Sequence, residues 1–383
     1  MIPRFEFTFS IRDFYTSFFS LNKEFTNQPP IEVEKYFNSA NLLFTEKARI
    51  GLKLILTNLD LKQNAKIGVQ PFTCSSVLNA ITKSGFSPVF IDIDRNLQMS
   101  IEDIDRKKNQ VDALIITHTF GFPDKVKEIK SLVIDKPVIE DCSQALFSGT
   151  DNKSVGSDGI AGIFSLGYGK LFGVGSGGII VSNDDDLYNR LKKSALEMTA
   201  PPFSKEIKSL SKNLSLGFLH NKHIYHNFTY TIKSQGKKNT IHLEKYPDFE
   251  YLMPGSFFSL FLSRFNQLKE FSKQQKSNGK RLNSMVDHRF RPISFPSDSS
   301  PNFFLIPLQS PDRDKIVNYL KENNIEAGKH FSNSASWVQL FNYSQRSCPN
   351  FEMITKEVFT IPCHYNLNDS QIEYIAGTLN NYK

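Results

Sequence analysis

The stretch FSLGYGKLFGVGSGG (residues 164–178) places Lys170 between a strand-like run and a series of glycines. Glycine adopts backbone angles that other residues avoid and lets a ligand approach the main chain closely. The run GVGSGG also approximates the dinucleotide-binding fingerprint, but that fingerprint follows a strand and opens a helix. Here the glycines lead directly into a second strand-like run, GIIVS (178–182), so the context does not fit. Taken alone, the stretch is most typical of a glycine-rich turn that carries a surface lysine.

A second stretch, VIEDCSQA (138–145), ends an apolar run in Glu140 and Asp141, with Gln144 three residues later. A buried aspartate needs a partner. One suitable partner is the protonated ring nitrogen of pyridoxal phosphate (PLP), whose ring withdraws electrons from a carbanion formed at the substrate carbon. The alternative is that Asp141 caps the following helix, which by itself is the more common role.

Short apolar runs alternate with stretches of helical length between residues 45 and 185. Several runs are nearly continuous in Val, Ile and Phe, as expected for strands covered on both faces. The alternation predicts an α/β protein with a mainly parallel sheet, and ligands bind at the carboxyl ends of such strands. The strand-like runs are KIGVQP (66–71), PVFIDID (88–94), DALIITH (112–118), PVIED (137–141), GIFSL (162–166) and GIIVS (178–182), and two of the helical stretches are Ser75–Ser84 and Asp124–Val133.

The chain has 383 residues, which is long enough to form two domains. We expect a large domain over residues 1–250 and a smaller α+β domain over residues 251–383. The segment 201–245 holds eight lysines and two glutamates and is interpreted as a solvated insertion, or less favourably as a basic flap over an anionic substrate. The second domain opens on a long amphipathic helix over 254–275. Further strands are expected at 303–308 and 358–362, and further helices at 312–323 and 368–380.

Composition argues against several other classes of protein. The chain is 39% hydrophobic with a net charge of +7, and it holds no apolar run of the roughly 20 residues that a membrane-spanning helix needs. We see no signal peptide at the start, so we expect a cytoplasmic protein. The four cysteines show no metal-ligand spacing, so we expect no metal site. No zinc finger or RNP sequence points to nucleic acid.

Together, the two stretches resemble the DegT/DnrJ/EryC1/StrS family, the sugar-aminotransferase branch of the fold-type-I PLP enzymes. That family has an E-D-x-x-Q stretch, then Ser-Phe-His-x-x-Lys, then Gly-x-Gly-Gly. Asp141 and Gln144 match the first, and Ser165 lies five residues before Lys170 as the pattern requires. Four more stretches match family motifs in the correct order, so the resemblance spans nearly the whole chain: FTEKARIGL (44–52), PFTCSSVLNAITKSGFSPVFIDID (71–94), HTFGFPD (118–124) and FTIPCHYNLND (359–369).

The resemblance implies a three-layer α/β/α large domain, a smaller C-terminal domain and a site for PLP. Lys170 would form the Schiff base with the cofactor, and Asp141 would pair with the pyridinium nitrogen. Gln144 would lie near the phenolic oxygen of the ring. Cys74 takes the position at which many relatives place an aromatic ring against the cofactor.

The resemblance also implies a phosphate site and weaker substrate contacts. Ser165 would hold the phosphate together with backbone groups at Ala48 and Arg49, because the N–H groups at a helix N-terminus favour an anion. His330 and Trp337 lie in the smaller domain, where substrate contacts often occur, and are weaker candidates for binding the substrate.

Three departures from the family pattern concern this site. Ser-Phe-His becomes Ser165-Leu166-Gly167, so the histidine is missing, and the usual Gly-Thr phosphate loop reads Ala48-Arg49. The stretch in which a neighbouring subunit usually supplies an asparagine begins here with Glu250. A glutamate beside a phosphate needs a cation between them. We therefore expect either that this loop shifts or that Arg49 compensates.

The resemblance implies a homodimeric aminotransferase that moves an amino group, from glutamate, onto a nucleotide-linked keto sugar for surface polysaccharide such as O-antigen or lipopolysaccharide. The basic charge suits such a substrate. A cyclitol or another non-sugar ketone stays open as the acceptor, and so does a scaffold that has lost activity. A PLP-dependent sugar dehydratase is less favoured, because such relatives carry histidine where Lys170 stands.

Overall fold

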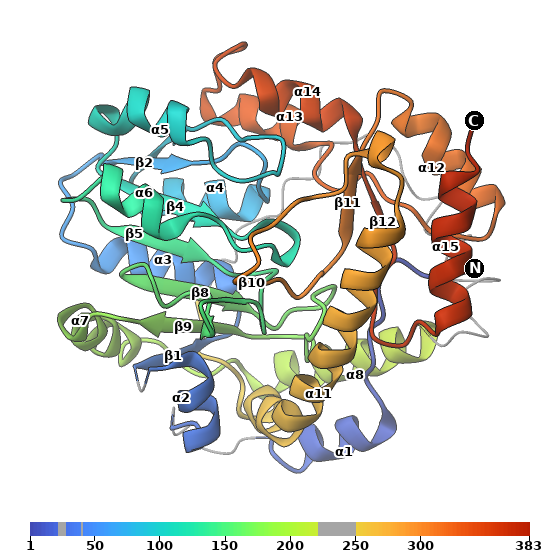
Figure 1. Cartoon of the computed structure of the whole chain (residues 1–383). Helices are drawn as coiled ribbons and strands as arrows, with labels where there is room; N and C mark the ends of the chain where they lie inside the picture. Colours follow the sequence, from blue (N-terminus) through green and yellow to red (C-terminus); the bar gives the residue numbers. More distant parts are fainter. Residues whose placement is uncertain (22–27, 40, 221–249) are drawn as a thin grey trace.

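The computed structural model describes residues 1–21, 28–39, 41–220 and 250–383, and its centre is a seven-stranded sheet (Figure 1). The strand order is β1-β9-β8-β5-β4-β2-β3. The strands from β8 to β3 pair in parallel, whereas β9 is antiparallel to both β8 and β1. The predicted α/β class with a mainly parallel sheet is confirmed. The strands are β1 (Leu42–Thr45), β2 (Lys66–Val69), β3 (Ser87–Phe90), β4 (Ala113–Thr117), β5 (Val138–Asp141), β8 (Ala161–Ser165) and β9 (Gly178–Ser182).

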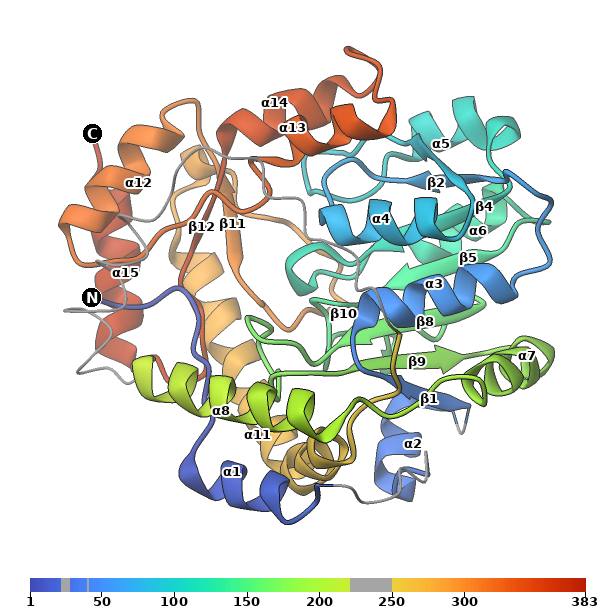
Figure 2. The ribbon, with the colours of Figure 1, turned by 180° about the vertical axis from the view of Figure 1, so that it is seen from behind.

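Helices cover both faces of this sheet. Two of them, α3 (Ala48–Asn58) and α4 (Ser75–Lys83), pack side by side on one face, with α7 (Asp185–Ala195) beside α3 (Figure 2). On the opposite face lie α5 (Ile101–Lys107) and α6 (Val126–Leu132) (Figure 1). All residues of β4, β5 and β9 are buried, which is why these runs are almost continuously apolar. Two further helices, α1 (Ile11–Phe18) and α2 (Ile31–Phe37), precede β1.

The C-terminal part contains a two-stranded antiparallel sheet surrounded by helices. Its strands are β11 (Ile306–Gln309) and β12 (Val358–Ile361), and its helices are α12 (Arg313–Glu322), α13 (Ser334–Trp337), α14 (Pro349–Glu357) and α15 (Asp369–Asn380). A third small sheet joins the two halves of the chain, because β10 (Ser299–Ser300) pairs with β6 (Gly149–Thr150), which pairs with β7 (Lys153–Ser154). The division at residue 250 remains a prediction.

The long helix expected over 254–275 is longer than predicted. Helix α11 (Gly255–Met285) starts directly after Pro254 and continues well past Gln275. Its second half buries polar residues that bond the C-terminal backbone. The Gln275 Nε2 amide donates to the Phe303 carbonyl at 2.6 Å, and the Asn278 Nδ2 amide donates to the His364 carbonyl at 3.0 Å. Because the buried face of α11 changes from apolar to polar residues, the apolar repeat in the sequence ends before the helix does.

The segment predicted as a solvated insertion, 201–245, begins with a packed helix. Helix α8 (Phe203–Leu219) buries Glu206, Leu210 and Asn213, whereas its other side chains are exposed or half-buried, so this part of the segment packs along one face only. The Glu206 carboxylate accepts a hydrogen bond from the backbone N–H of Ser256 at the start of α11. Residues 221–245 lie outside the described residues. Among the helices that are described, none has both the length and the apolar character needed to span a membrane.

Glu140 joins β5 to the loop before β8. Its carboxylate accepts hydrogen bonds from the backbone N–H groups of Gly156, Asp158 and Gly159 at 2.6–2.8 Å. His118 accepts at Nδ1 from the backbone of Asp124, so its proton lies on Nε2, which donates to Glu140 at 2.9 Å. Burial alone would raise the pKa of Glu140, but His118 and these N–H groups outweigh it and the pKa is lowered. Glu140 and His118 are therefore structural.

Replacement of this carboxylate tests the network. We expect Glu140→Gln to lower the free energy of unfolding by roughly 2–4 kcal/mol, because one amide cannot accept the bonds that the carboxylate accepts. The exposed Glu128→Gln on α6 should change it by less than about 0.5 kcal/mol. Since the folded-state pKa of Glu140 is lowered, its contribution is present above the ordinary value of 4.5 and disappears as the pH falls. Urea unfolding of both variants at pH 7 and pH 4 measures this; equal stabilities at pH 7 would contradict it.

Candidate active site

The candidate site lies where β5 and β8 end side by side. These strands are parallel, and Asp141, the last residue of β5, is in register with Ile163 of β8. Ser165 ends β8 two residues later, so both polar residues lie at the same edge of the sheet. Asp141 is only 4% exposed, and its Oδ1 accepts a hydrogen bond from the backbone N–H of Ser143 at 3.0 Å. Among the described hydrogen bonds, Asp141 Oδ2 takes part in none.

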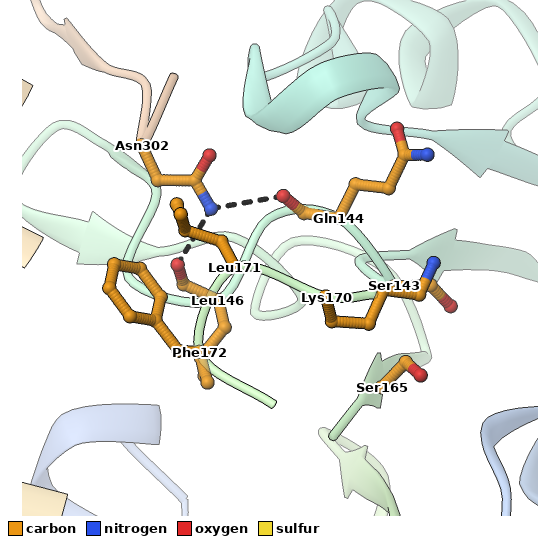
Figure 3. A pocket seen from close by; sticks show the side chains of 8 residues that line it. All are labelled: Ser143, Gln144, Leu146, Ser165, Lys170, Leu171, Phe172 and Asn302. Atoms are coloured by element: carbon orange, nitrogen blue, oxygen red, sulfur yellow. Dashed lines mark hydrogen bonds between the residues drawn. The ribbon is translucent and has the colours of Figure 1, made fainter. Parts of the chain in front are cut away.

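A small hollow opens beside these strand ends (Figure 3). It combines polar side chains from both strand ends with the side chain of Lys170, so the structure brings together Gln144, Ser165 and Lys170, three of the predicted site residues. Its apolar wall is formed by buried side chains that limit access of water. The lining residues are Ser143, Gln144, Leu146, Ser165, Lys170, Leu171, Phe172 and Asn302.

Lys170 is positioned by the connection between β8 and β9. Its backbone N–H donates to the Gly167 carbonyl at 3.2 Å, and its own carbonyl accepts from Gly173 at 3.1 Å. The backbone N–H of Val174 then returns to the Leu166 carbonyl at 3.0 Å, next to the end of β8. The lysine therefore sits at the junction of two consecutive tight turns that are closed by backbone hydrogen bonds. This explains why the glycine-rich stretch holds a lysine at a defined position.

The start of α3 lies against the end of this glycine stretch. Ser165 pairs with Gly178 across β8 and β9. A Cβ atom at Gly178 would lie 2.6 Å from the backbone nitrogen of Ala48, the first residue of α3, so only glycine permits this approach. The arrangement groups the Ser165 side chain with the N-terminus of an 11-residue helix, which are the groups predicted to hold a phosphate.

Gln144 connects the hollow to the C-terminal part of the chain. Its Oε1 accepts a hydrogen bond from the backbone N–H of Phe120 at 2.7 Å, and its Nε2 lies 3.4 Å from Nε2 of His330. Burial, then the positive charges of Arg4 and Lys170, hold the pKa of His330 well below its usual value. His330 is therefore neutral at physiological pH. The structure thus brings His330 to the predicted site.

Other predicted residues lie outside the lining of the hollow. Cys74 precedes α4 as its N-cap, half-buried, with its sulfur 3.1 Å from the Ser76 hydroxyl. Trp337 ends α13, and its buried Nε1 has no hydrogen-bond partner within the described chain. Arg49 is the second residue of α3. The predicted roles of these three residues remain predictions.

The glutamate that departs from the family pattern has a cationic neighbour. Lys53, one turn beyond the start of α3, donates to the Glu250 carboxylate at 2.6 Å. Both side chains are about one quarter exposed, at 26% and 25%. Lys53 thus compensates the charge of Glu250, whereas the sequence had led us to expect either a shift of this loop or compensation by Arg49. Because Lys53 and Glu250 are far apart in the sequence, no local pattern connects them.

Asn302 is a residue of the site that sequence reasoning missed. Its Nδ2 amide donates to the carbonyls of Gln144 and Leu146, at 2.9 and 2.8 Å (Figure 3). Its Oδ1 accepts from the backbone N–H of Phe304 at 2.9 Å. Asn302 therefore fixes the loop after β5 from the opposite half of the chain. It stands in no recognisable motif, so no signal in the sequence marked it.

Comparison with known proteins places the chain in a family. The family model described as the DegT/DnrJ/EryC1/StrS aminotransferase family matches residues 16–380. The GDP-perosamine synthase of Escherichia coli O157:H7 is 34% identical over 145 residues, which cover 37% of this chain and 40% of the relative. A UDP-N-acetyl-3-dehydro-alpha-D-glucosamine 3-aminotransferase of Acidithiobacillus ferrooxidans is 33% identical over 147 residues, again 40% of its length. The matched segments thus span two fifths of these relatives.

Solved structures share the fold along the whole chain. The sugar aminotransferase CalS13 from Micromonospora echinospora superposes with a TM-score of 0.79 at 18% identity, covering 100% of both chains. Helicobacter pylori PseC, an aminotransferase of pseudoaminic acid biosynthesis, gives a TM-score of 0.75 at 19% identity, covering 99% of this chain and 98% of its own. With the family model matching from residue 16 to residue 380, the chain belongs to the DegT/DnrJ/EryC1/StrS aminotransferase family, as its spaced motifs predicted.

Proposed function

We propose that this protein is a PLP-dependent aminotransferase that transfers an amino group from glutamate to a nucleotide-linked keto sugar. The observation that carries the proposal is the shared hollow of Lys170, Ser165 and Gln144 beside the buried carboxylate of Asp141. An amine, a carboxylate and a helix N-terminus together form the set of groups that this chemistry requires. Family membership and the names of the perosamine synthase and glucosamine aminotransferase relatives support the same activity.

The residues present fit the cofactor. The Asp141 carboxylate keeps one oxygen outside the described hydrogen bonds and can hold a proton on a ring nitrogen. The Ser165 hydroxyl and the backbone N–H groups at Ala48 and Arg49 can receive the phosphate, because α3 presents its positive dipole end there. When bound, PLP supplies an electron-withdrawing ring that stabilises negative charge at the substrate carbon.

Lys170 and its surroundings would carry out the proton transfers. With the cofactor bound, the Lys170 amine would hold it covalently, and when released the same Nζ atom would be the group that accepts and returns a proton. Because the His330 ring beside Gln144 is neutral, it adds no positive charge near the Lys170 amine. The buried side chains of Leu171 and Phe172 exclude water from one side of the hollow. Lys170 retains the amine that a dehydratase relative lacks.

The substrate class rests on charge and on resemblance. A net charge of +7 favours an anionic substrate such as a sugar linked to a nucleoside diphosphate. The named relatives act on sugars of this kind, so we propose a role in the synthesis of surface polysaccharide such as O-antigen, carried out in the cytoplasm.

We also propose that two chains associate as a homodimer. Helix α1 exposes Ile11 and Tyr15, and Phe19 directly follows it, so three large apolar side chains lie at helical spacing with exposed fractions of 67%, 56% and 74%. Exposed apolar surface of this kind is typical of an interface between proteins.

The proposed activity is tested with purified protein, PLP, glutamate and a panel of nucleotide-linked keto sugars, with product mass as the readout. We expect at least one sugar to gain an amine and glutamate to become 2-oxoglutarate. Lys170→Ala should abolish the transfer because it removes both the Schiff base and the proton carrier. A cyclitol and a simple ketone belong in the same panel. Amination of these alone would refute the sugar substrate, and no amination at all would refute the proposed activity.

The role of Asp141 predicts a loss of turnover without a loss of fold. Asp141→Asn keeps the shape and the bond from Ser143 but removes the negative charge, so kcat should fall roughly a hundredfold or more. The exposed Asp135→Asn serves as the matched control and should keep normal kinetics. Steady-state kinetics and thermal unfolding of both variants measure this. A near-normal kcat in Asp141→Asn would rule out the pyridinium role.

The proposed homodimer predicts twice the chain mass of 43.7 kDa in solution. Light scattering coupled to size exclusion at micromolar concentration measures it. Tyr15→Lys in α1 should shift the population toward monomer, because a charge buried in an apolar interface is costly. A wild-type protein that is monomeric at these concentrations would contradict the proposal.

A further inference from the structure

The first residues of the chain pack against the C-terminal half. The backbone N–H of Ile2 donates to the Asn324 carbonyl at 2.7 Å, and its carbonyl accepts from Glu326 at 3.0 Å. Figures 1 and 2 both show this segment passing beside β12 before it descends to α1. The backbone N–H of Arg4 donates to the Glu326 carboxylate at 2.9 Å. Arg4 is therefore held in place by its main chain, which leaves its side chain available for another purpose.

A glycine makes room for the Arg4 side chain. A Cβ atom at Gly328 would lie 1.7 Å from Nη1 of Arg4, so any other residue would displace the guanidinium. Gly328 has no left-handed backbone angle, and it pairs with Thr360 through backbone bonds of 2.9 and 2.8 Å. Its backbone geometry would suit any residue. Glycine at position 328 therefore leaves space for the Arg4 guanidinium; the conformation of the main chain does not require it.

The guanidinium has positive charge that the described chain does not neutralise by an ion pair. Its Nε atom is buried and has no hydrogen-bond partner within the described residues. The Glu326 carboxylate accepts a hydrogen bond from the backbone N–H of Arg4. A partly buried guanidinium is costly unless an anion or several acceptors surround it.

The charges of Arg4 and Lys170 both affect the same histidine, His330. His330 follows Gly328 by two residues and lies 3.4 Å from Gln144, which lines the hollow. The charges of Arg4 and Lys170 both lower the pKa of His330. Gly328, which accommodates the guanidinium, and His330, which lies 3.4 Å from Gln144, connect Arg4 to the side of the hollow that Gln144 lines. Binding of an anion there would offset the positive charge of Arg4 and Lys170.

We infer that Arg4 is a substrate-binding residue that pairs with an anionic oxygen group of a molecule bound in the Lys170 hollow. This inference rests on the proposed function and extends it. The anionic group is either a carboxylate of the donor amino acid or a phosphate of the nucleotide-linked sugar. A guanidinium binds either one through two parallel N–H···O bonds. Because Arg4 belongs to the N-terminal segment, that segment is part of the active site.

Equilibrium binding to the PLP-loaded protein tests the role of Arg4 without relying on turnover. Isothermal titration with glutarate represents the donor carboxylates, and titration with UDP and GDP represents the sugar carrier. In Arg4→Gln, which keeps much of the side-chain length, we expect one of the two ligand classes to bind roughly tenfold to a hundredfold more weakly. Arg4→Lys should recover part of that loss, because it restores the charge but not the planar fork.

Two further variants separate binding from folding. The exposed Arg12→Ala in α1 should leave both affinities unchanged. Gly328→Ala should reproduce the selective loss seen in Arg4→Gln, because its Cβ occupies the position of the guanidinium. Thermal unfolding shows which variants remain folded, and Arg4→Lys provides the test if Arg4→Gln does not fold.

The outcomes distinguish this inference from the proposed function. A loss confined to glutarate assigns Arg4 to the donor, and a loss confined to the nucleotides assigns it to the acceptor. If the wild-type protein binds a ligand and folded Arg4 variants bind it equally well, the inference is wrong while the proposed function stands. If the wild-type protein binds neither ligand class and aminates no sugar, the proposed function itself fails.

Discussion

The candidate site depends on the position of β8 between β5 and β9. Its parallel register with β5 places Ser165 beyond Asp141 at the same edge of the sheet, and its antiparallel register with β9 places Ser165 opposite Gly178. Backbone hydrogen bonds fix these registers, and a shift of one residue would turn every side chain to the other face. The connection between β8 and β9 carries Lys170, so the same strand sets the positions of the carboxylate, the hydroxyl and the amine.

Groups from distant parts of the chain complete the site around this edge. Asn302 holds the loop after β5, and Lys53 compensates the charge of Glu250. The charges of Arg4 and Lys170 lower the pKa of a histidine that burial keeps neutral. The chemistry we propose therefore needs both halves of the molecule. The central sheet and its loops supply the amine and carboxylate, and the C-terminal part supplies Asn302 in the lining and His330 beside Gln144.

Features encoded by local pattern could be predicted, and features created by tertiary contact could not. The runs of the central sheet and the turn around Lys170 carry their own signals, because buried strands are continuously apolar and close backbone approach requires glycine. The end of α11 was missed since its buried residues there include Gln275 and Asn278, which bond backbone carbonyls instead of extending an apolar stripe. Asn302 lies outside every motif, and only the folded chain brings it to the hollow; Arg4, whose role we infer, also stands in no motif.

The proposed function depends on attachment of the cofactor to the Lys170 amine. The most direct measurement is reduction of the PLP-loaded protein with borohydride, which makes a Schiff base permanent, followed by peptide mass spectrometry. We expect one pyridoxyl group, located on Lys170, and none when the protein is first incubated with excess glutamate. A pyridoxyl group on a different lysine, or a reduced protein without any, would contradict it.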